Sequence, residues 1–280
     1  MKYILDKVNH CNFKSYECGR LAPRAYCIPH TKLKSAKAVD YKSERYNSDM
    51  VTILSGEWEF KYYKKKSKLP ATIDTSKIKF DKVNVPSTWQ RTGYEIPEYI
   101  NTPYGFDNRK FGGEWGKGVR PPELPEDFSC GIYRKFINIE DKTKNYVLTF
   151  LGITPCVDLY VNGVFVGFGE GAHNSYEFDV TEYLKEGENE ILAVVFKWSI
   201  GSYLEAQDMF RENGIFRDVL LYTYEKSYIN DFEAVAEKKG KKYNLNIKAE
   251  VKGGVKNATV KASLYDGKNL VAEGEAEGTK

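Results

Sequence analysis

Two carboxylates lie close together in a tyrosine-containing stretch of this 280-residue chain. Glu205 and Asp208 are three residues apart, and two carboxylates that face a reacting bond can donate and accept the protons of its cleavage. A second interpretation rests on Arg211 and Arg217, which follow in the same stretch. Carboxylates beside arginines form charge-assisted pairs that fix the shape of a loop. We favour this loop-shaping role for Glu205 and Asp208.

Histidines and cysteines offer two other kinds of chemistry. His173 can be read as a general base, but no carboxylate or nucleophile is tied to it by spacing, so a surface turn histidine is the favoured interpretation. Cys27 and His30 have the C-x-x-H spacing of a zinc half-site. Cys18 and either Cys11 or His10 would complete the four ligands. The spacing between the two halves fits no established zinc pattern.

The stretch that holds the two carboxylates, residues 198–219, separates two predicted strands, Asn189–Lys197 and Asp218–Tyr224. It reads WSIGSYLEAQDMFRENGIFRDV and follows neither the strand period nor the helix period. A connection of this length inside a compact domain is usually functional or disordered. Its aromatic residues and charges argue against disorder, and so does the small number of glycines, which is only two. We predict an ordered surface loop, called the signature loop below.

The signature loop closely resembles the end of the sugar-binding domain of glycoside hydrolase family 2, of the bacterial β-galactosidase type. The matching residues are Trp198-Ser199, Gly201-Ser202-Tyr203-Leu204-Glu205, Gln207-Asp208-Met209, Arg211 and Gly214-Ile215-Phe216-Arg217-Asp218-Val219. One position departs from the family. Where the family carries an Asp that touches galactose and helps to hold a sodium ion, this chain has Ile200, which can do neither.

The resemblance extends to the segment GYEIPEYIN, whose final Asn reaches the galactosyl group in the family. That residue is Asn101 here, although before Thr102-Pro103 it is equally well an Asx-turn residue. The resemblance implies a sugar-binding set and a structural set in the loop. The first set is Asn101, Tyr99, Ser199, Tyr203 and Glu205, and the second is Trp198, Asp208, Arg211 and Arg217. It implies no cofactor in this chain and Mg²⁺ or Na⁺ in the parent enzyme, with the sodium site put in doubt by Ile200.

The elements that position these residues read as strands. Trp58, Phe60 and Tyr62 alternate with charged residues within Val51–Tyr63, which predicts a strand with one buried face. Asn162-Gly163 between two alternating apolar runs predicts a type I′ hairpin. Asn189–Lys197 is apolar on both faces at its centre, as in a strand covered on both sides. Trp89, after Val85-Pro86, reads as a core anchor. Short strands with almost no helix indicate an all-β sandwich, which the resemblance narrows to a jelly roll.

The composition changes twice along the chain. Residues 1–48 are polar and irregular and resemble the family's N-terminal arm, which packs against other domains or subunits and in which no metal is expected. Residues 49–225 form the predicted jelly roll. From residue 226 to 280, four alternating segments resemble the opening strands of an immunoglobulin-like domain, which needs about seven strands. They are Asn230–Ala236, Tyr243–Val251, Ala258–Tyr265 and Leu270–Glu277. We expect a truncated second domain.

The resemblance implies a non-catalytic N-terminal portion of a glycoside hydrolase that acts on terminal β-D-galactosides. The catalytic glutamates of the family lie in a downstream (β/α)₈ barrel, so we expect no activity from this chain alone. The implied partners are a β-galactoside or related sugar, the missing barrel and further copies of the parent. Two alternatives remain open, which are a parent that acts on another β-glycoside, such as a glucuronide or mannoside, and a stand-alone lectin-like module. An assembly module without a ligand is a third.

Composition excludes other classes of function. With 42 basic and 39 acidic residues, the net charge of +3 does not indicate a nucleic-acid-binding protein, and the basic run at residues 61–68 reads as a solvated strand end. No apolar run approaches the ~20 residues of a membrane helix, and Asp6 and Lys7 interrupt any signal peptide. Five cysteines, an odd number, predict reduced thiols and a cytoplasmic protein.

Overall fold

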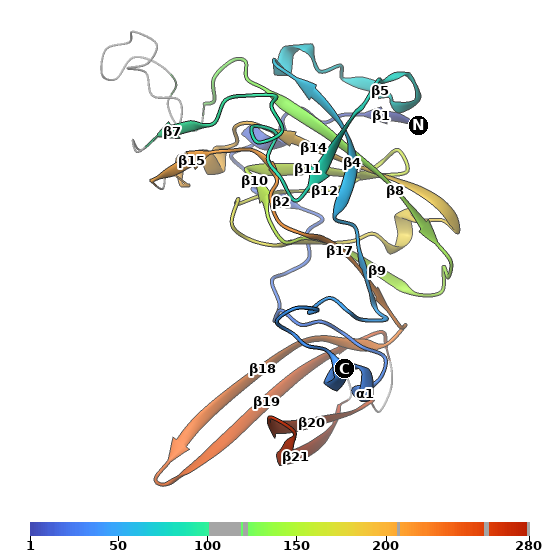
Figure 1. Cartoon of the computed structure of the whole chain (residues 1–280), viewed down its shortest axis with the longest axis vertical. Coiled ribbons are helices and arrows are strands. Elements are labelled where there is room, and N and C mark those ends of the chain that lie inside the picture. Colours follow the sequence, from blue (N-terminus) through green and yellow to red (C-terminus); the bar gives the residue numbers. More distant parts are fainter. Residues whose placement is uncertain (101–118, 120–122, 206–207, 255–257, 279–280) are drawn as a thin grey trace. The chain divides into compact units, whose positions relative to one another are not determined.

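A computed structural model describes residues 1–100, 119, 123–205, 208–254 and 258–278. The chain divides into two compact units. The first comprises Met1–Leu21, Val51–Lys142 and Tyr146–Tyr222, and the second comprises Ala22–Met50, Thr143–Asn145 and Thr223–Lys280. Strands dominate both units (Figure 1), which confirms the all-β prediction. Within the described ranges, no helix is both long and apolar enough to cross a membrane.

The first unit is built on two antiparallel sheets (Figure 1). The seven-stranded sheet has the order β2 (Glu17–Cys18), β12 (Val164–Glu170), β11 (Cys156–Val161), β14 (Gly187–Phe196), β8 (Cys130–Ile139), β4 (Gly56–Tyr63) and β6 (Asp81–Val85). The four-stranded sheet has the order β13 (Tyr176–Asp179), β9 (Asn145–Phe150), β17 (Val219–Tyr224) and β3 (Val51–Ile53). Three shorter strand pairs also belong to the first unit. They are β1 (Lys2–Ile4) with β5 (Thr72–Asp74), β7 (Glu98–Ile100) with β15 (Met209–Arg211), and β10 (Ile153–Thr154) with β16 (Gly214–Ile215). The described residues of the first unit also form the 3₁₀ turns η1 (Asn9–Cys11), η2 (Lys66–Lys68), η3 (Thr75–Lys77), η5 (Thr181–Tyr183) and η6 (Ile200–Tyr203).

The central strand β14 is buried on both faces, as its sequence predicts. Ala193 and Val195 belong to the large core cluster that also holds Trp58, Trp89 and Phe178. The alternate residues, Leu192, Val194 and Phe196, belong to a second cluster with Tyr3 and Leu5. Because side chains alternate between the faces of a strand, each face of β14 needs its own cover. The N-terminal segment, through Tyr3 and Leu5, packs on the face of β14 that carries the second cluster.

The N-terminal arm is divided between the two units. Residues 1–21 belong to the first unit, where β1 pairs with β5 and β2 pairs with β12. His10 is fully buried, stacks on Phe196 at a ring distance of 4.1 Å and lies edge-on to Phe128. The arm therefore closes the outer face of the protein's own seven-stranded sheet. Residues 22–50 belong to the second unit and include the short helix α1 (Leu33–Ala38).

The predicted strand over Val51–Tyr63 is in fact two strands in different sheets. β3 pairs with β17, whereas β4 pairs with β6 and β8. Gly56 has φ +108° at the point where the chain crosses between the sheets, a conformation that glycine adopts without steric cost. Trp58 and Phe60 are buried as predicted. The Asn162-Gly163 hairpin is confirmed, because both residues have positive φ and Val161 pairs with Val164.

The second unit contains two long hairpins. β18 (Tyr228–Lys239) pairs with β19 (Lys242–Lys252), and β20 (Ala258–Asp266) pairs with β21 (Asn269–Gly278). These are the four strands that the sequence predicts, each with slightly wider bounds. Many of their apolar side chains are exposed, among them Leu245, Ile247 and Leu264. The hairpins therefore present apolar faces that the described residues leave largely uncovered.

Candidate functional site

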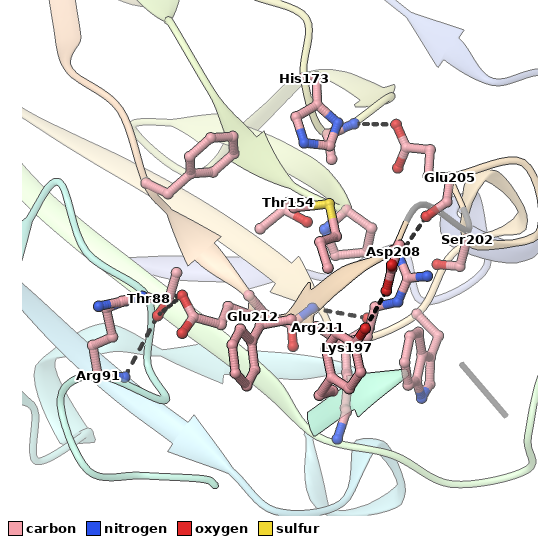
Figure 2. Close-up of a pocket in the computed structure, with 18 residues that line it drawn as sticks. Thr88, Arg91, Thr154, His173, Lys197, Ser202, Glu205, Asp208, Arg211 and Glu212 are labelled. Carbon is pink, nitrogen blue, oxygen red and sulfur yellow. Dashed lines mark hydrogen bonds and ion pairs between the residues drawn. The ribbon is translucent and has the colours of Figure 1, made fainter. Parts of the chain in front are cut away.

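A cavity of about 440 Å³ opens over the signature loop in the first unit (Figure 2). One wall is formed by residues between 197 and 216, and a second by Thr154, Pro155, Ala172 and His173. Thr88, Arg91 and Tyr99 line it from the segments after β6. Aromatic rings and a few charged groups in one concave surface are typical of a small-molecule site.

Strand pairing brings the predicted sugar-binding segment to the signature loop. Tyr99 on β7 pairs with Phe210 on β15, and their rings meet edge to face with centroids 5.6 Å apart. The Tyr99 hydroxyl donates a hydrogen bond to Asp208 Oδ1, which raises the pKa of Tyr99. Asn101, two residues further along, lies outside the described residues. Tyr99 and the loop, 109 residues apart in sequence, therefore form one wall of the cavity.

Glu205 is held by the turn that follows β12. Its Oε1 accepts a hydrogen bond from the backbone N–H of Ala172 at 2.6 Å. Burial raises the pKa of Glu205, and the Ala172 N–H, His173 and Arg211 oppose this rise. In Figure 2, Glu205 lies on the His173 side of the cavity and Asp208 on the Lys197 side. Each carboxylate is thus bound to a donor from a different segment, which supports the loop-shaping interpretation over an acid–base pair.

The two arginines of the loop contact backbone carbonyls. Arg211 Nη1 donates to the carbonyl oxygen of Glu205. Arg217 Nη1 donates to the carbonyl oxygens of Leu151 and His173, each at 3.3 Å. The sequence predicts arginine–carboxylate pairing, and for Arg217 the contacts seen are with main-chain oxygens. A guanidinium has several donors in a fixed plane, so it can tie two backbone segments together in this way.

Two other residues of the predicted sugar-binding set support the loop from within. Ser199 is fully buried, and its backbone N–H donates to Ser202 Oγ at 3.1 Å. The Tyr203 hydroxyl donates to the carbonyl oxygen of Glu123. Trp198 is 8% exposed and lines the cavity. In this structure Tyr99 and Glu205 line the cavity, whereas Ser199 caps the turn η6 that precedes Glu205.

A largely buried ion pair, whose Lys197 also lines the cavity, escaped the sequence analysis. Lys197 Nζ lies 2.6 Å from Glu95 Oε1 and 3.5 Å from Glu98 Oε1, and the Lys197 side chain is 9% exposed. Glu95 Oε2 also accepts hydrogen bonds from Trp89 Nε1 at 2.9 Å and Ser129 Oγ at 3.1 Å. A lysine at the end of an apolar strand is the only signal in the sequence, and it does not reveal a partner 102 residues away.

Glu170, at the end of β12, is the second residue that the sequence analysis missed. It is 6% exposed, and its Oε2 accepts a hydrogen bond from the N–H of Gly201 at 2.7 Å. Burial raises its pKa from 4.5 to about 7, and the charge of Glu205 adds to this rise. The Gly201 N–H and the Ser199 hydroxyl favour the ionised form and act against it. A carboxyl group whose pKa is close to neutral thus lies directly behind the signature loop.

The described residues do not form the metal sites considered above. No group of three or more His, Cys, Asp or Glu side chains in the described parts of the chain is arranged to hold a metal ion. His10 lies in an aromatic enclosure with its Nε2 3.3 Å from Lys66 Nζ, and burial lowers its pKa to about 3. At the position of the family's sodium ligand, Ile200 offers only hydrocarbon. The Ile200 side chain therefore cannot serve as a sodium ligand.

Comparisons with known proteins agree with this geometry. The model of the family "Glycosyl hydrolases family 2, sugar binding domain" matches residues 51–225. A β-galactosidase of Actinobacillus pleuropneumoniae is 38% identical over 227 residues, which cover 81% of this chain and 21% of that enzyme. A β-galactosidase of Staphylococcus xylosus is 36% identical over 234 residues, covering 82% and 22%. The chain thus spans about a fifth of the length of these curated relatives.

Solved structures share the fold. A β-glucuronidase from glycoside hydrolase family 2 superposes with a TM-score of 0.60 at 19% identity, over 82% of this chain and 25% of that one. A β-glycosidase from Bacteroides vulgatus superposes with a TM-score of 0.55 at 19% identity, over 81% and 28%. The matched family model covers more than half of the chain, including the four-stranded sheet, every strand of the seven-stranded sheet except β2, and the signature loop. The chain therefore belongs to glycoside hydrolase family 2 and contains its sugar binding domain.

Proposed function

We propose that this chain is the non-catalytic N-terminal portion of a β-galactosidase-type glycoside hydrolase and that its cavity shapes one side of the sugar site. The observation that carries the proposal is the pairing of β7 with β15, which brings Tyr99 and the signature loop into one wall. The names of the curated relatives support β-galactosides as the substrates of the parent. The reactive carboxylates and the barrel that carries them would come from the rest of the parent.

The lining suits a sugar, which presents an apolar face and a ring of hydroxyl groups. Tyr99 and Phe210 are 54% and 56% exposed, and Trp198 forms a further aromatic surface. Aromatic rings can cover the apolar face, because they combine a large hydrophobic surface with little loss of side-chain entropy. Glu205 and Asp208 can accept hydrogen bonds from hydroxyl groups. The chain's own contribution would be binding and orientation of the sugar.

Two observations keep other functions under consideration. Ile200 replaces the family's galactose-contacting residue, which favours a parent that acts on another β-glycoside, such as a glucuronide or mannoside. The exposed Tyr99 and Phe210 rings favour a lectin-like module that binds sugar by itself. We further propose that Mg²⁺ or Na⁺ and homo-oligomerisation belong to the parent enzyme. The odd number of cysteines, five, supports a place in the reducing cytoplasm.

Titration calorimetry with methyl β-galactoside, lactose and glucuronic acid tests the binding role. We expect dissociation constants in the millimolar range for the favoured sugar, since part of the site is supplied by another region. Glu205→Gln should weaken binding by roughly tenfold, the value of one hydrogen bond to a charged group, whereas the exposed Glu188→Gln should have no effect. Micromolar binding by the chain alone would instead favour the lectin.

Hydrolysis of nitrophenyl β-galactoside tests the non-catalytic role. We expect no turnover by the chain alone and measurable turnover after addition of the remaining region of a parent enzyme in trans. The expectation follows because retaining glycosidases need two carboxyl groups about 5 Å apart across the scissile bond, and Glu205 and Asp208 are each bound within the loop scaffold. Turnover by the chain alone, abolished by Glu205→Gln, would contradict the proposal.

A further inference from the structure

The signature loop and the turn after β12 exchange two hydrogen bonds of the same kind. Glu170, on the turn side, accepts the N–H of Gly201 at 2.7 Å. Glu205, on the loop side, accepts the N–H of Ala172 at 2.6 Å. Gly201 lies within η6, and Ala172 follows the last residue of β12 by two positions. Each segment thus supplies one carboxylate and one backbone donor.

This reciprocal arrangement fixes Glu205 more firmly than either bond would alone. Backbone N–H groups are set by the fold, so a carboxylate bound to one of them loses its freedom relative to that segment. Glu170 holds the start of η6, and Glu205 follows η6 by two residues. Space around Gly201 is tight, since a Cβ there would lie 3.1 Å from Glu170 Oε2 and 3.4 Å from Ser199 Oγ. Glu170 therefore determines where the loop enters the cavity wall.

We propose that Glu170 is a positioning residue of the sugar site, which orients Glu205 by clamping the signature loop to the turn after β12. Its consequence for sugar binding rests on the proposed function, whereas the clamp can be measured without any sugar. Glu170 does not line the cavity, so it acts through the loop and not by touching a ligand. Glu205 is the group that would meet the sugar.

The clamp also responds to pH. Within the described ranges, the titratable groups that interact with Glu170 are carboxyls, thiols and a phenol. They are Cys11 from the N-terminal arm, Cys156 and Asp158 from β11, Tyr176 from β13, and Glu205 from the loop. Burial favours the neutral form of Glu170, and a negative Glu205 acts in the same direction. The closed loop therefore binds a proton, and opening the loop to water releases it.

Hydrogen exchange of the Gly201 and Ala172 amides in the whole chain tests the clamp directly. We expect Glu170→Ala to accelerate exchange at both amides by at least tenfold, since one bond is removed and the other loses its support. Glu170→Gln keeps an acceptor oxygen in the same place and should stay within about threefold of the wild type at pH 6, in line with the modest net value of one hydrogen bond. Glu188→Gln removes an exposed charge and serves as the control.

The pH profile separates positioning from a purely structural role. After correction for intrinsic exchange, the wild type should lose protection at Gly201 between pH 5 and pH 7, and Glu170→Gln should not. Superimposable profiles, or unchanged exchange in Glu170→Ala, would overturn the proposal. If Glu170→Ala fails to fold, the comparison of the Glu170→Gln pH profile with that of the wild type still decides whether Glu170 clamps the loop.

Sugar affinity provides the functional readout. Titration with methyl β-galactoside should show at least a fivefold weaker affinity in Glu170→Ala and an affinity near the wild type in Glu170→Gln at pH 6. Faster exchange with unchanged affinity would overturn the positioning role. If the wild type binds none of the sugars, the proposed function fails, and the exchange profiles still decide whether Glu170 clamps the loop.

Discussion

Replacing Lys197 by methionine should lower the free energy of unfolding by up to about 3 kcal/mol, the lower end of the range for breaking a buried ion pair, because the Glu95 side chain is 22% exposed. Lys197 lies 2.6 Å from Glu95, and its side chain is 9% exposed. Methionine fills similar space but leaves Glu95 without a counter-charge in a largely buried place. Urea unfolding followed by tryptophan fluorescence measures the loss.

An exposed ion pair of the same length gives a matched control. Lys82 Nζ also lies 2.6 Å from its partner, Glu57 Oε1, but the two side chains are 69% and 58% exposed. Lys82→Met should therefore cost less than about 1 kcal/mol. The double variant Lys197→Met with Glu95→Gln should recover most of the lost stability, because the amide introduced by Glu95→Gln carries no charge. Equal losses in Lys197→Met and Lys82→Met would contradict a buried pair.

The elements that sequence reasoning predicts are those whose cause is local. Asn162-Gly163 specifies its hairpin because two adjacent residues must adopt positive φ. Strand β14 is recognisable because burial of both faces leaves a continuous apolar run. The break at Gly56 was missed because Val51–Tyr63 keeps a plausible strand pattern across it, and nothing in that pattern shows that its two parts join different sheets.

The site depends on contacts that no local pattern encodes. Glu95 meets Lys197 across 102 residues, and Glu170 meets Gly201 across 31. Both acidic residues look like ordinary surface carboxylates in the sequence, since charged residues are rarely buried. The same holds for the N-terminal segment, whose Tyr3 stands in a three-residue apolar run and whose His10 lies among polar residues, yet the two fill the second core cluster and its edge. Only the approach of distant strands determines these environments.

The stability of the first unit should depend on pH through Glu170, and Glu170→Gln should remove that dependence. Burial raises the pKa of this carboxyl from 4.5 to about 7, so the folded state binds the proton more tightly than the unfolded state. The sign follows from linkage: stability is highest below pH 4.5, falls as pH rises, and levels off above about pH 7. At about 1.4 kcal/mol per pKa unit, the wild type loses roughly 3 kcal/mol over this range relative to Glu170→Gln.

Thermal unfolding of both proteins from pH 4 to pH 8 measures this difference. With about 2–4 °C for each kcal/mol in a domain of this size, Glu170→Gln should gain roughly 6–12 °C relative to the wild type as pH rises from 4 to 8. Glu205 also has a raised pKa, but it is present in both proteins, so its contribution cancels to first order in the difference. Glu188→Gln, which removes an exposed carboxylate, should track the wild type throughout. A wild-type minus Glu170→Gln difference that stays constant with pH would mean that the pKa of Glu170 is the same in the folded and unfolded states, and the closed loop would then carry a buried charge instead of a proton at neutral pH.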